Sequence, residues 1–378
     1  FSLFSRNPTV APGDRVVLLD PSYDSYAPIV RAAGGEVVAL PLVPPEKKKE
    51  EGEDKASTSP SSSWSLPPKR DLEEAIGDRH TKLVVVNSPH NPTGKVFTAQ
   101  ELELIAGIVR EKHPDGRCLL LLDEVYQHLV HPSPPAAAKK KEEEEGGVVR
   151  EEAGEGAAAA AAAAAAAQQA TAAKSGDGVG GESEENGRKN QYGHISLASL
   201  PDMAQRSVRV GSAGKTFSLT GFKIGWATSS NPALTSALFR AHQFLTFCCP
   251  PCLQAGVAAG FEECSSYFLT LGSELAEKRK RLEGWVTRSG FTALPAEGTY
   301  FLVADARRLM KTGETDAEFC VRLAVEGGVA AIPLSAFYND KGRAPRTLVR
   351  FCFCKRDEVL DEGGRRLEAF WEKQQQRN

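Results

Sequence analysis

The 378-residue sequence has no long apolar run, little net charge and few aromatic residues. No stretch approaches the ~18 consecutive apolar residues that a transmembrane helix needs. The alanine run at 157–167 is too short and too weakly hydrophobic to serve as one. The net charge of −3 and the aromatic content of 7% provide no global field that would favour nucleic acid or a membrane surface. We therefore expect neither among the partners of this protein.

Cysteine is also sparse, with eight scattered residues. This usage favours reduced thiols in an intracellular protein. We expect it to be cytoplasmic, while mitochondrial or plastid targeting stays open because the sequence upstream of Phe1 is not visible. One cluster, Cys248, Cys249 and Cys252, has no second pair at zinc-finger spacing, and His242 is the only imidazole nearby. We predict ordinary thiols there and no metal site.

Short apolar runs alternate with turn and helix patterns in the first part of the chain. Residues 15–19, 36–40, 83–87 and 118–122 are typical of buried strands. A helical segment at 22–35 joins the first two, and this βαβ unit implies a parallel sheet with right-handed crossovers. A short helix is predicted at 71–76. A longer one begins with the capping box of Thr98 and Glu101 and ends near His113. The fold class is therefore α/β.

Three polar side chains follow predicted strands. Asn91 comes shortly after the strand at 83–87, Asp123 directly after the strand at 118–122, and Lys215 after an apolar run at 208–210. In open α/β sheets, ligands bind beyond the carboxyl ends of the strands. We therefore expect these three side chains at the functional edge of one sheet.

The chain divides into a predicted large domain, 1–264, and a smaller α/β domain, 265–378. The large domain contains a polar loop at 44–68 and a low-complexity segment at 133–190, which we predict to be a disordered insertion without chemistry. Further helices are predicted at 234–244, from 254 to 261, at 267–289 and at 358–373, and further strands at 299–303, 329–332 and 348–354. Alternation in the last strand places Arg350, Cys352 and Cys354 on one face.

The segment 210–226, VGSAGKTFSLTGFKIGW, carries the sharpest chemical signal. Its Gly-Lys pair suggests a phosphate-binding loop, but Arg209 stands where that motif needs a glycine. The alternative is a lysine that forms a Schiff base, Lys215, with Ser212 and Lys223 as phosphate ligands. This interpretation needs partners from elsewhere in the chain.

Six segments in this order resemble the pyridoxal-phosphate-dependent, fold-type I, class I/II aminotransferases: NSPHNPTGKVF, DEVYQ, HISLASLP, GSAGKTFSLTGFKIGW, SSYF and VRFCF. They are most similar to the kynurenine aminotransferase group, also known as glutamine–phenylpyruvate transaminase and cysteine-S-conjugate β-lyase. The resemblance runs nearly end to end outside 133–190 and the polar loop. It implies a mostly parallel sheet with helices on both faces, a smaller C-terminal α/β domain and the cofactor pyridoxal 5′-phosphate.

The resemblance also implies roles for residues around the cofactor ring. Lys215 resembles the lysine of the internal aldimine, which later acts as general acid and base. Asp123 matches the aspartate that pairs with the pyridine nitrogen and keeps it protonated. Tyr126 and Asn91 resemble the two hydrogen-bonding partners of the ring 3-oxygen. Tyr23 stands where the group carries an aromatic side chain stacked on the ring.

The remaining roles concern the phosphate and the substrate. Ser212 and Lys223 resemble phosphate ligands; lysine at the second position matches the kynurenine group, whereas many class I enzymes have arginine there. Arg350 resembles the arginine that binds the substrate α-carboxylate, a role suited to the guanidinium fork. Asn91 is expected to contact the substrate as well.

The sequence departs from the family in two places. The family has about a hundred residues before the point that matches Phe1, including a glycine-containing turn whose amides hold the phosphate at a helix N-terminus. We therefore expect this N-terminal part of the fold to be missing and the 378-residue chain to bind cofactor weakly or to misfold. Cys248 stands where the kynurenine enzymes have a histidine that reaches a neighbouring active site in the dimer. Substrate preference is therefore not carried over.

The leading hypothesis is transamination between an L-amino acid and a 2-oxo acid. The amino acid is expected to be aromatic, kynurenine-like, glutamine or methionine, and the full-length protein is expected to be a homodimer. One alternative is a β-lyase that acts on cysteine S-conjugates at the same site. Another is an inactive truncated product. A nucleotide-binding module is the least favoured because of Arg209.

Overall fold

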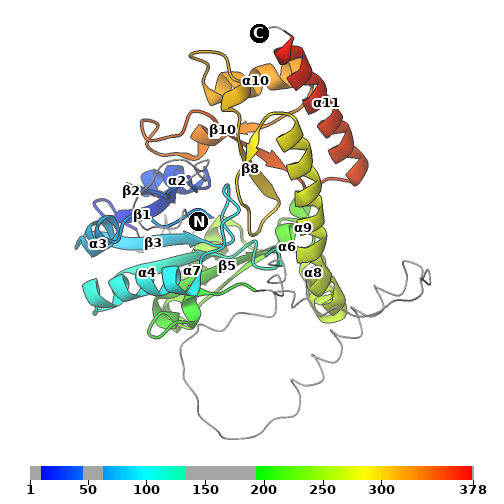
Figure 1. Ribbon diagram of the computed structural model, residues 1–378. Coiled ribbons are helices and arrows are strands. Elements are labelled where there is room, and N and C mark those ends of the chain that lie inside the picture. Colours follow the sequence, from blue (N-terminus) through cyan, green and yellow to red (C-terminus); the bar gives the residue numbers. More distant parts are fainter. Residues whose placement is uncertain (1–9, 46–62, 133–192, 377–378) are drawn as a thin grey trace, which may run out of the picture. The chain divides into compact units, whose positions relative to one another are not determined.

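The computed structural model describes residues 10–45, 63–132 and 193–376. The predicted insertion at 133–190 and residues 46–62 of the predicted polar loop lie outside these described residues. The described part of the chain contains one sheet of six strands and one of four, with helices packed against both (Figure 1). The predicted α/β class is confirmed.

The six-stranded sheet has the order β2-β1-β3-β4-β5-β6. Its strands are β1 (Arg15–Asp20), β2 (Glu36–Pro41), β3 (Thr81–Asn87), β4 (Leu119–Asp123), β5 (Ser207–Ser212) and β6 (Gly225–Thr228). The first five strands pair in parallel, and β6 pairs antiparallel with β5. Because parallel strands run in one direction, the ends of β3, β4 and β5 meet at the same edge of the sheet.

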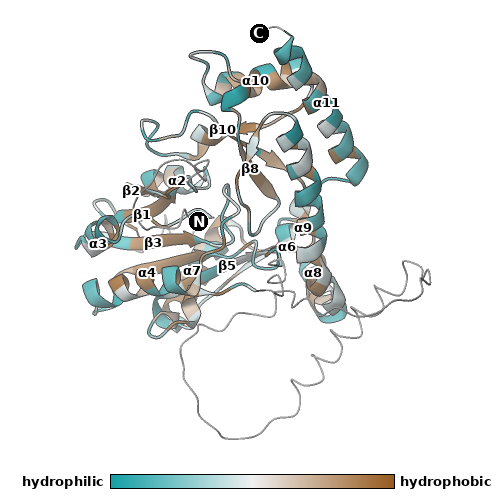
Figure 2. Ribbon diagram, viewed as in Figure 1, coloured by the Kyte–Doolittle hydropathy of each residue, from teal (hydrophilic) through white to brown (hydrophobic). Residues whose placement is uncertain are grey.

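Both faces of the central strands β1, β3 and β4 are buried, as their continuous apolar sequences predict. Val17 and Leu19 of β1 face a cluster formed with α3 (Lys69–Gly77) and α4 (Ala99–Lys112). Val16 and Leu18 face a second cluster formed with α2 (Tyr26–Ala32) and α7 (Pro232–Leu245). The hydropathy colouring shows the apolar strands between more polar helix surfaces (Figure 2). The predicted helices on both faces are therefore confirmed.

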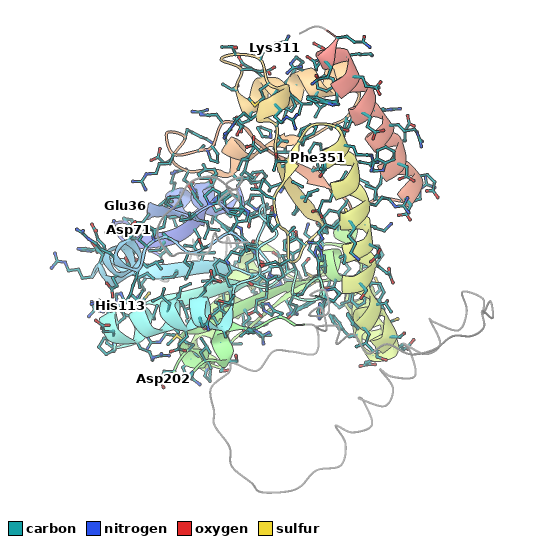
Figure 3. All side chains as sticks on the ribbon, in the orientation of Figure 1. Glu36, Asp71, His113, Asp202, Lys311 and Phe351 are labelled. Carbon is teal, nitrogen blue, oxygen red and sulfur yellow. The ribbon has the colours of Figure 1, made fainter. Side chains whose placement is uncertain are left out.

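The helix α4 begins and ends as its sequence predicts. The Thr98 hydroxyl accepts the Glu101 backbone N–H at 3.2 Å, and the Glu101 carboxylate accepts the Thr98 N–H at 2.9 Å. At the other end, His113 (labelled in Figure 3) caps the helix. Its Nε2 lies 2.6 Å from the carbonyl oxygen of Ile76. This contact joins the ends of α3 and α4.

The four-stranded sheet is antiparallel, with the order β7-β8-β10-β9. Its strands are β7 (Thr292–Ala293), β8 (Phe301–Asp305), β9 (Ile332–Pro333) and β10 (Leu348–Cys352). The helices α9 (Ser265–Arg288), α10 (Asp316–Gly327) and α11 (Asp357–Gln375) supply side chains to its core, in which Phe351 is buried (Figure 3). A further helix, α8 (Pro251–Glu263), precedes α9.

Shorter helical segments complete the described chain. They are α6 (Ala213–Thr216), η1 (Leu197–Ser199), η2 (Ala204–Arg206), η3 (Thr220–Phe222), η4 (Arg307–Leu309) and η5 (Leu334–Phe337). In the part of the chain described, no helix has the length and apolar character to cross a membrane. The predicted domain boundary after residue 264 falls between α8 and α9 and stays a prediction.

Three predicted segments differ from the structure. The strand predicted at 299–303 begins only at Phe301, because Thr299 has a φ of 66°, in the left-handed region that strands do not use. Of the strand predicted at 329–332, only Ile332 is in β9, after the left-handed C-cap Gly328. The segment 210–226 ends in strand β6, which the sequence pattern did not predict. There the Trp226 ring lies over Gly211, where a Cβ atom would come within 2.1 Å of it.

Candidate active site

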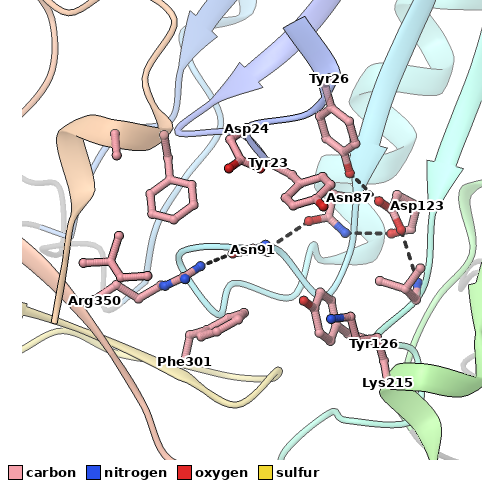
Figure 4. Close-up of a pocket in the computed structure, with 14 residues that line it drawn as sticks. Tyr23, Asp24, Tyr26, Asn87, Asn91, Asp123, Tyr126, Lys215, Phe301 and Arg350 are labelled. Carbon is pink, nitrogen blue, oxygen red and sulfur yellow. Dashed lines mark hydrogen bonds between the residues drawn. The ribbon is translucent and has the colours of Figure 1, made fainter. Parts of the chain in front are cut away.

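A cavity of about 490 Å³ lies beyond the carboxyl ends of β3 and β4 (Figure 4). It is lined by Tyr23, Asp24, Tyr26, Asn87, Asn91, Asp123, Val125, Tyr126, Lys215, Phe301, Ile332, Ala336, Phe337 and Arg350. Six of these are residues that the sequence predicted for the site. Both sheets contribute to the lining, since Asp123 ends β4 and Arg350 lies in β10. The predicted convergence of Asn91, Asp123 and Lys215 at one sheet edge is therefore found.

Asp123 contributes a carboxylate to the cavity lining. The Tyr26 hydroxyl donates a hydrogen bond to its Oδ2, and the Val125 backbone N–H lies 3.4 Å from its Oδ1. The Asn87 side chain fixes the same residue by donating to its carbonyl oxygen at 2.8 Å. Burial raises the pKa of the Asp123 carboxyl, and the Tyr26 hydrogen bond opposes this rise. The carboxylate would therefore be stabilised by a cationic partner.

Lys215 presents its amine to the same cavity (Figure 4). It lies in the four-residue helix α6, which begins where β5 ends. Its Nζ donates to the Tyr300 hydroxyl at 3.2 Å and lies 5.8 Å from the centroid of the Tyr126 ring. Tyr126 is buried, and burial raises its pKa well above the ordinary value, so it is a neutral hydrogen-bond donor at neutral pH.

Arg350 and Asn91 join the two sheets across the cavity. The guanidinium donates to Asn91 Oδ1 at 2.6 Å and lies 3.9 Å from the centroid of the Phe301 ring and 4.5 Å from that of Phe337. Asn91 is held in turn by its backbone N–H, which donates to Asn87 Oδ1 at 2.8 Å. Burial lowers the pKa of Arg350, but a guanidinium keeps its charge in proteins. The cavity thus offers a fixed cation suited to a carboxylate.

An amine, a half-buried carboxylate and a fixed guanidinium around one cavity agree with the comparison of this sequence with known proteins. The sequence matches the family Aminotransferase class I and II over residues 8–161 and 176–367. The chain belongs to the class I and II aminotransferases. The family uses pyridoxal phosphate as its cofactor, as the sequence motifs imply.

Named relatives of this aminotransferase differ in the substrates that their names give. A Mycobacterium tuberculosis protein named as a probable N-succinyldiaminopimelate aminotransferase is 33% identical over 372 residues, which are 96% of this chain and 73% of that protein. Kynurenine–oxoglutarate transaminase 3 of Mus musculus is 32% identical over 368 residues, which are 93% of this chain and 65% of that protein. The chain therefore spans between 65% and 73% of the length of these two relatives.

Solved structures give the same family. That of N-succinyldiaminopimelate aminotransferase from Mycobacterium tuberculosis has a TM-score of 0.71 and 31% identity, with 98% of this chain and 74% of that chain covered. A methionine aminotransferase from Escherichia coli has a TM-score of 0.69 and 26% identity, with 97% and 73% covered. The fold-type I assignment is thereby confirmed.

The residues of the cavity fit pyridoxal phosphate. The half-buried Asp123 carboxylate, which accepts from the Tyr26 hydroxyl and the Val125 N–H, would take the protonated ring nitrogen. The Lys215 amine would hold the aldehyde carbon, and the Tyr126 hydroxyl and Asn91 amide are lining groups able to hydrogen-bond the ring oxygen. Tyr23, which is 42% exposed, lines the same cavity and meets Tyr26 edge to face.

The two predicted phosphate ligands lie outside the cavity lining. Ser212 is the residue from which α6 begins, and its side chain makes no capping hydrogen bond. Lys223 is exposed and has a left-handed backbone, with a φ of 57°. Their role as phosphate ligands stays a prediction. Among the described residues, no three His, Cys, Asp or Glu side chains are grouped to hold a metal ion, and the expected absence of a metal also stays a prediction.

Several lining or supporting residues were not predicted from the sequence. Tyr26 lies three residues after Tyr23 in the segment 22–35 that the sequence predicts as helical, so this spacing suggests that both lie on one side of it, although α2 begins only at Tyr26. The Tyr300 hydroxyl reaches Lys215 from the turn before β8, a contact that spans 85 residues of sequence. No local pattern could have indicated it. The same is true of Phe301 and Phe337, which flank Arg350.

Proposed function

We propose that this chain catalyses the transfer of an amino group between an L-amino acid with a large uncharged side chain and a 2-oxo acid. The observation that carries the proposal is the placement of Lys215, Asp123 and Arg350 around one cavity. These three groups supply what the reaction needs: an amine that can move a proton, a carboxylate for the cofactor ring and a cation for the substrate carboxylate.

Each residue has a separate task. Arg350 binds the α-carboxylate of the substrate through its guanidinium fork, and Asn91, hydrogen-bonded to it at 2.6 Å, orients the fork. Bound pyridoxal phosphate supplies the electron sink for negative charge at the substrate Cα. Asp123 would hold the proton on the nitrogen of the bound cofactor ring. With the cofactor bound, the Lys215 amine would take the proton from the substrate Cα and hold it for return, while the Tyr300 hydroxyl, 3.2 Å away, positions that amine.

The wall of the cavity supports a substrate with an aromatic, kynurenine-like, glutamine or methionine side chain. Phe301, Phe337, Ile332 and Tyr23 present apolar surface to the cavity. Asp24 is the additional carboxylate of the lining besides Asp123 and would repel a substrate that carries a further carboxylate near it. We therefore expect the substrate of this chain to carry less negative charge than N-succinyldiaminopimelate, the compound in the name of one relative.

The test is a substrate comparison with pyridoxal phosphate present. We expect kynurenine, phenylalanine, glutamine or methionine to transfer its amino group to a 2-oxo acid without a second carboxylate, such as 2-oxobutanoate. N-succinyldiaminopimelate should react at least about tenfold more slowly as amino donor. Substitution of Asp24 by asparagine should narrow this gap. Preference for the acidic substrate would contradict the proposed substrate class. Release of pyruvate from a cysteine S-conjugate without a 2-oxo acid would instead show the β-lyase, and absence of both reactions would overturn the proposal.

We also propose that the working form is a homodimer. Three phenylalanines on or just after α7 support it, since Phe239 is 68%, Phe244 85% and Phe247 80% exposed. Large apolar side chains exposed at this level can be covered by association with a second copy. Light scattering should give twice the mass of one chain, and a monomer at micromolar concentration would contradict the homodimer.

A further inference from the structure

Two cysteines meet at the end of β10. The sulfur atoms of Cys352 and Cys354 lie 3.2 Å apart. Cys352 is half-buried beside the core of the second sheet, and Cys354 is exposed. All eight cysteines are free thiols, and this is the one pair whose sulfur–sulfur contact the described structure records. The two residues have no part in the proposed transamination.

The backbone explains why these sulfur atoms are so close. Residues i and i+2 of a strand share a face but lie about 6.5 Å apart along it. Here β10 ends at Cys352, and the Phe353 N–H still donates to the Tyr300 carbonyl at 3.0 Å. The next donor, the Lys355 N–H, turns back to the Phe353 carbonyl at 2.8 Å. This three-residue turn centred on Cys354 brings its side chain back over Cys352.

The surroundings make Cys352 the nucleophile of the pair. A hydrogen bond joins the two sulfur atoms, and either thiol can be its donor. With Cys354 as the donor, this bond is the largest cause that lowers the pKa of Cys352. The Cys354 backbone N–H and the positive charges of Lys355 and Arg350 act in the same direction, against the effect of burial. The same hydrogen bond raises the pKa of Cys354. The thiolate is the reactive form of cysteine, so Cys352 reacts first.

We propose that Cys352 and Cys354 form a thiol–disulfide exchange site for small disulfides of the glutathione type. The Cys352 thiolate attacks one sulfur of the small disulfide, forms a mixed disulfide and releases one small thiolate. Cys354 then gives its proton to that thiolate and attacks the Cys352 sulfur. The second small thiolate leaves, and a disulfide joins Cys352 to Cys354. Two protein thiols are oxidised, and one small disulfide is reduced.

The exposure of the two thiols fits this order. Cys354 is exposed, and its sulfur lies next to that of Cys352, which carries the mixed disulfide. Cys354 can therefore attack the Cys352 sulfur without a large movement. Cys248 and Cys264 are also exposed but have no sulfur neighbour recorded in the described structure. They serve as internal references for the reactivity of ordinary exposed thiols.

The experiment uses the whole chain, treated with oxidised glutathione, alkylated and digested with trypsin. Cleavage after Arg350 and Lys355 releases one peptide, residues 351–355, that contains both cysteines. We expect the mass of this peptide to be two hydrogen atoms lower than that of its reduced form, with no alkyl or glutathione group attached. This oxidised peptide should form about tenfold faster than glutathione adducts at Cys248 or Cys264. Reduction with dithiothreitol should restore both thiols. This measurement on the unmodified sequence does not depend on any variant.

Two variants test the order of attack. Cys354→Ser should retain glutathione on Cys352, because the resolving thiol is gone, whereas Cys352→Ser should leave Cys354 as slow as Cys248. Alkylation of both cysteines in the unmodified chain, or equal rates of adduct formation in the two variants, would overturn the proposal. The experiment has no step in common with a transaminase assay, so its failure would leave the proposed function untouched.

Discussion

At the scale of single residues, Arg350 is fixed before any substrate arrives. Asn91 accepts one of its N–H groups at 2.6 Å, and the rings of Phe301 and Phe337 flank its guanidinium. A cation held in one orientation loses little entropy when it binds a carboxylate.

Substitution of Arg350 by lysine keeps the positive charge but removes the bidentate contact with the substrate carboxylate. We expect KM for the amino acid to rise about 10- to 100-fold, with a smaller change in kcat, because a charge-assisted bidentate contact loses about 1.5–3 kcal/mol. Steady-state kinetics will measure both constants. The same substitution at the exposed Arg346 is the matched control. An unchanged KM in the Arg350 variant would remove this residue from the substrate site.

Residues with a chemical role inside a local motif could be predicted from the sequence. Lys215, Asp123 and Asn91 follow strands and stand in recognisable segments, and the structure brings all three to one cavity. Tyr26 and Tyr300 could not be assigned, because each acts through one hydroxyl on a distant partner. Such contacts depend on how the elements pack, which no local spacing encodes.

At the scale of elements, the turn after β3 depends on Gly94. Its φ is 73°, and its N–H donates to the His90 carbonyl at 2.8 Å across the turn that contains Asn91. An added Cβ would lie 2.8 Å from the Cβ of Ala296 and 3.1 Å from the carbonyl oxygen of Gly298. The turn therefore needs glycine both for its conformation and for its close approach to this neighbouring segment.

A pair of alanine substitutions separates these two requirements. Gly116 has a φ of 74° and open space where its Cβ would lie, so Gly116→Ala measures the conformational cost alone, about 1 kcal/mol. We expect Gly94→Ala to destabilise the chain by about 1–3 kcal/mol more and also to raise KM, because Asn91 moves. Urea unfolding and kinetics will measure the two effects. Equal destabilisation in both variants would show that the close approach is unimportant.

Elements with a strong periodic or capping signal were predicted well. The five parallel strands and α4 agree in type with the sequence pattern, and both halves of the Thr98 capping box are formed. The pattern failed where conformation is set by contacts across sheets. The strand β6 forms because Gly211 and Gly225 allow close pairing of the backbones next to the Trp226 ring. The strand β8 begins only after Thr299, because that residue has a left-handed backbone conformation.

At the scale of the whole molecule, buried histidines link stability to pH. Burial lowers the pKa of His131 to about 4, and that of His128 to about 4, from the ordinary value of 6.5. Above pH 6.5 each is neutral in both the folded and unfolded states. Between pH 6.5 and 4 the unfolded chain binds protons that the folded chain refuses, so stability falls as the pH falls. Asp123, whose pKa burial raises, opposes part of this trend.

A comparison of variants isolates one histidine from the rest. Between pH 6.5 and 4 the unfolding free energy should fall less steeply with pH in His131→Gln than in the unmodified chain. We expect the slope to be smaller by up to about 1.4 kcal/mol per pH unit. His80→Gln, at an exposed position, should leave the slope unchanged. Urea denaturation at several pH values will give both slopes. An unchanged slope for His131→Gln would mean that this imidazole is protonated in the folded chain.

The most direct test of the account is to locate the amine that holds the cofactor. Borohydride reduction of the protein with pyridoxal phosphate fixes the cofactor on that amine, and tryptic digestion after Arg209 and Lys223 releases residues 210–223. We predict one cofactor group on this peptide, at Lys215, which blocks cleavage there. It should be lost in Lys215→Ala and retained in Lys223→Ala. Attachment to Lys223, or to no lysine of this segment, would contradict the assignment of the active site.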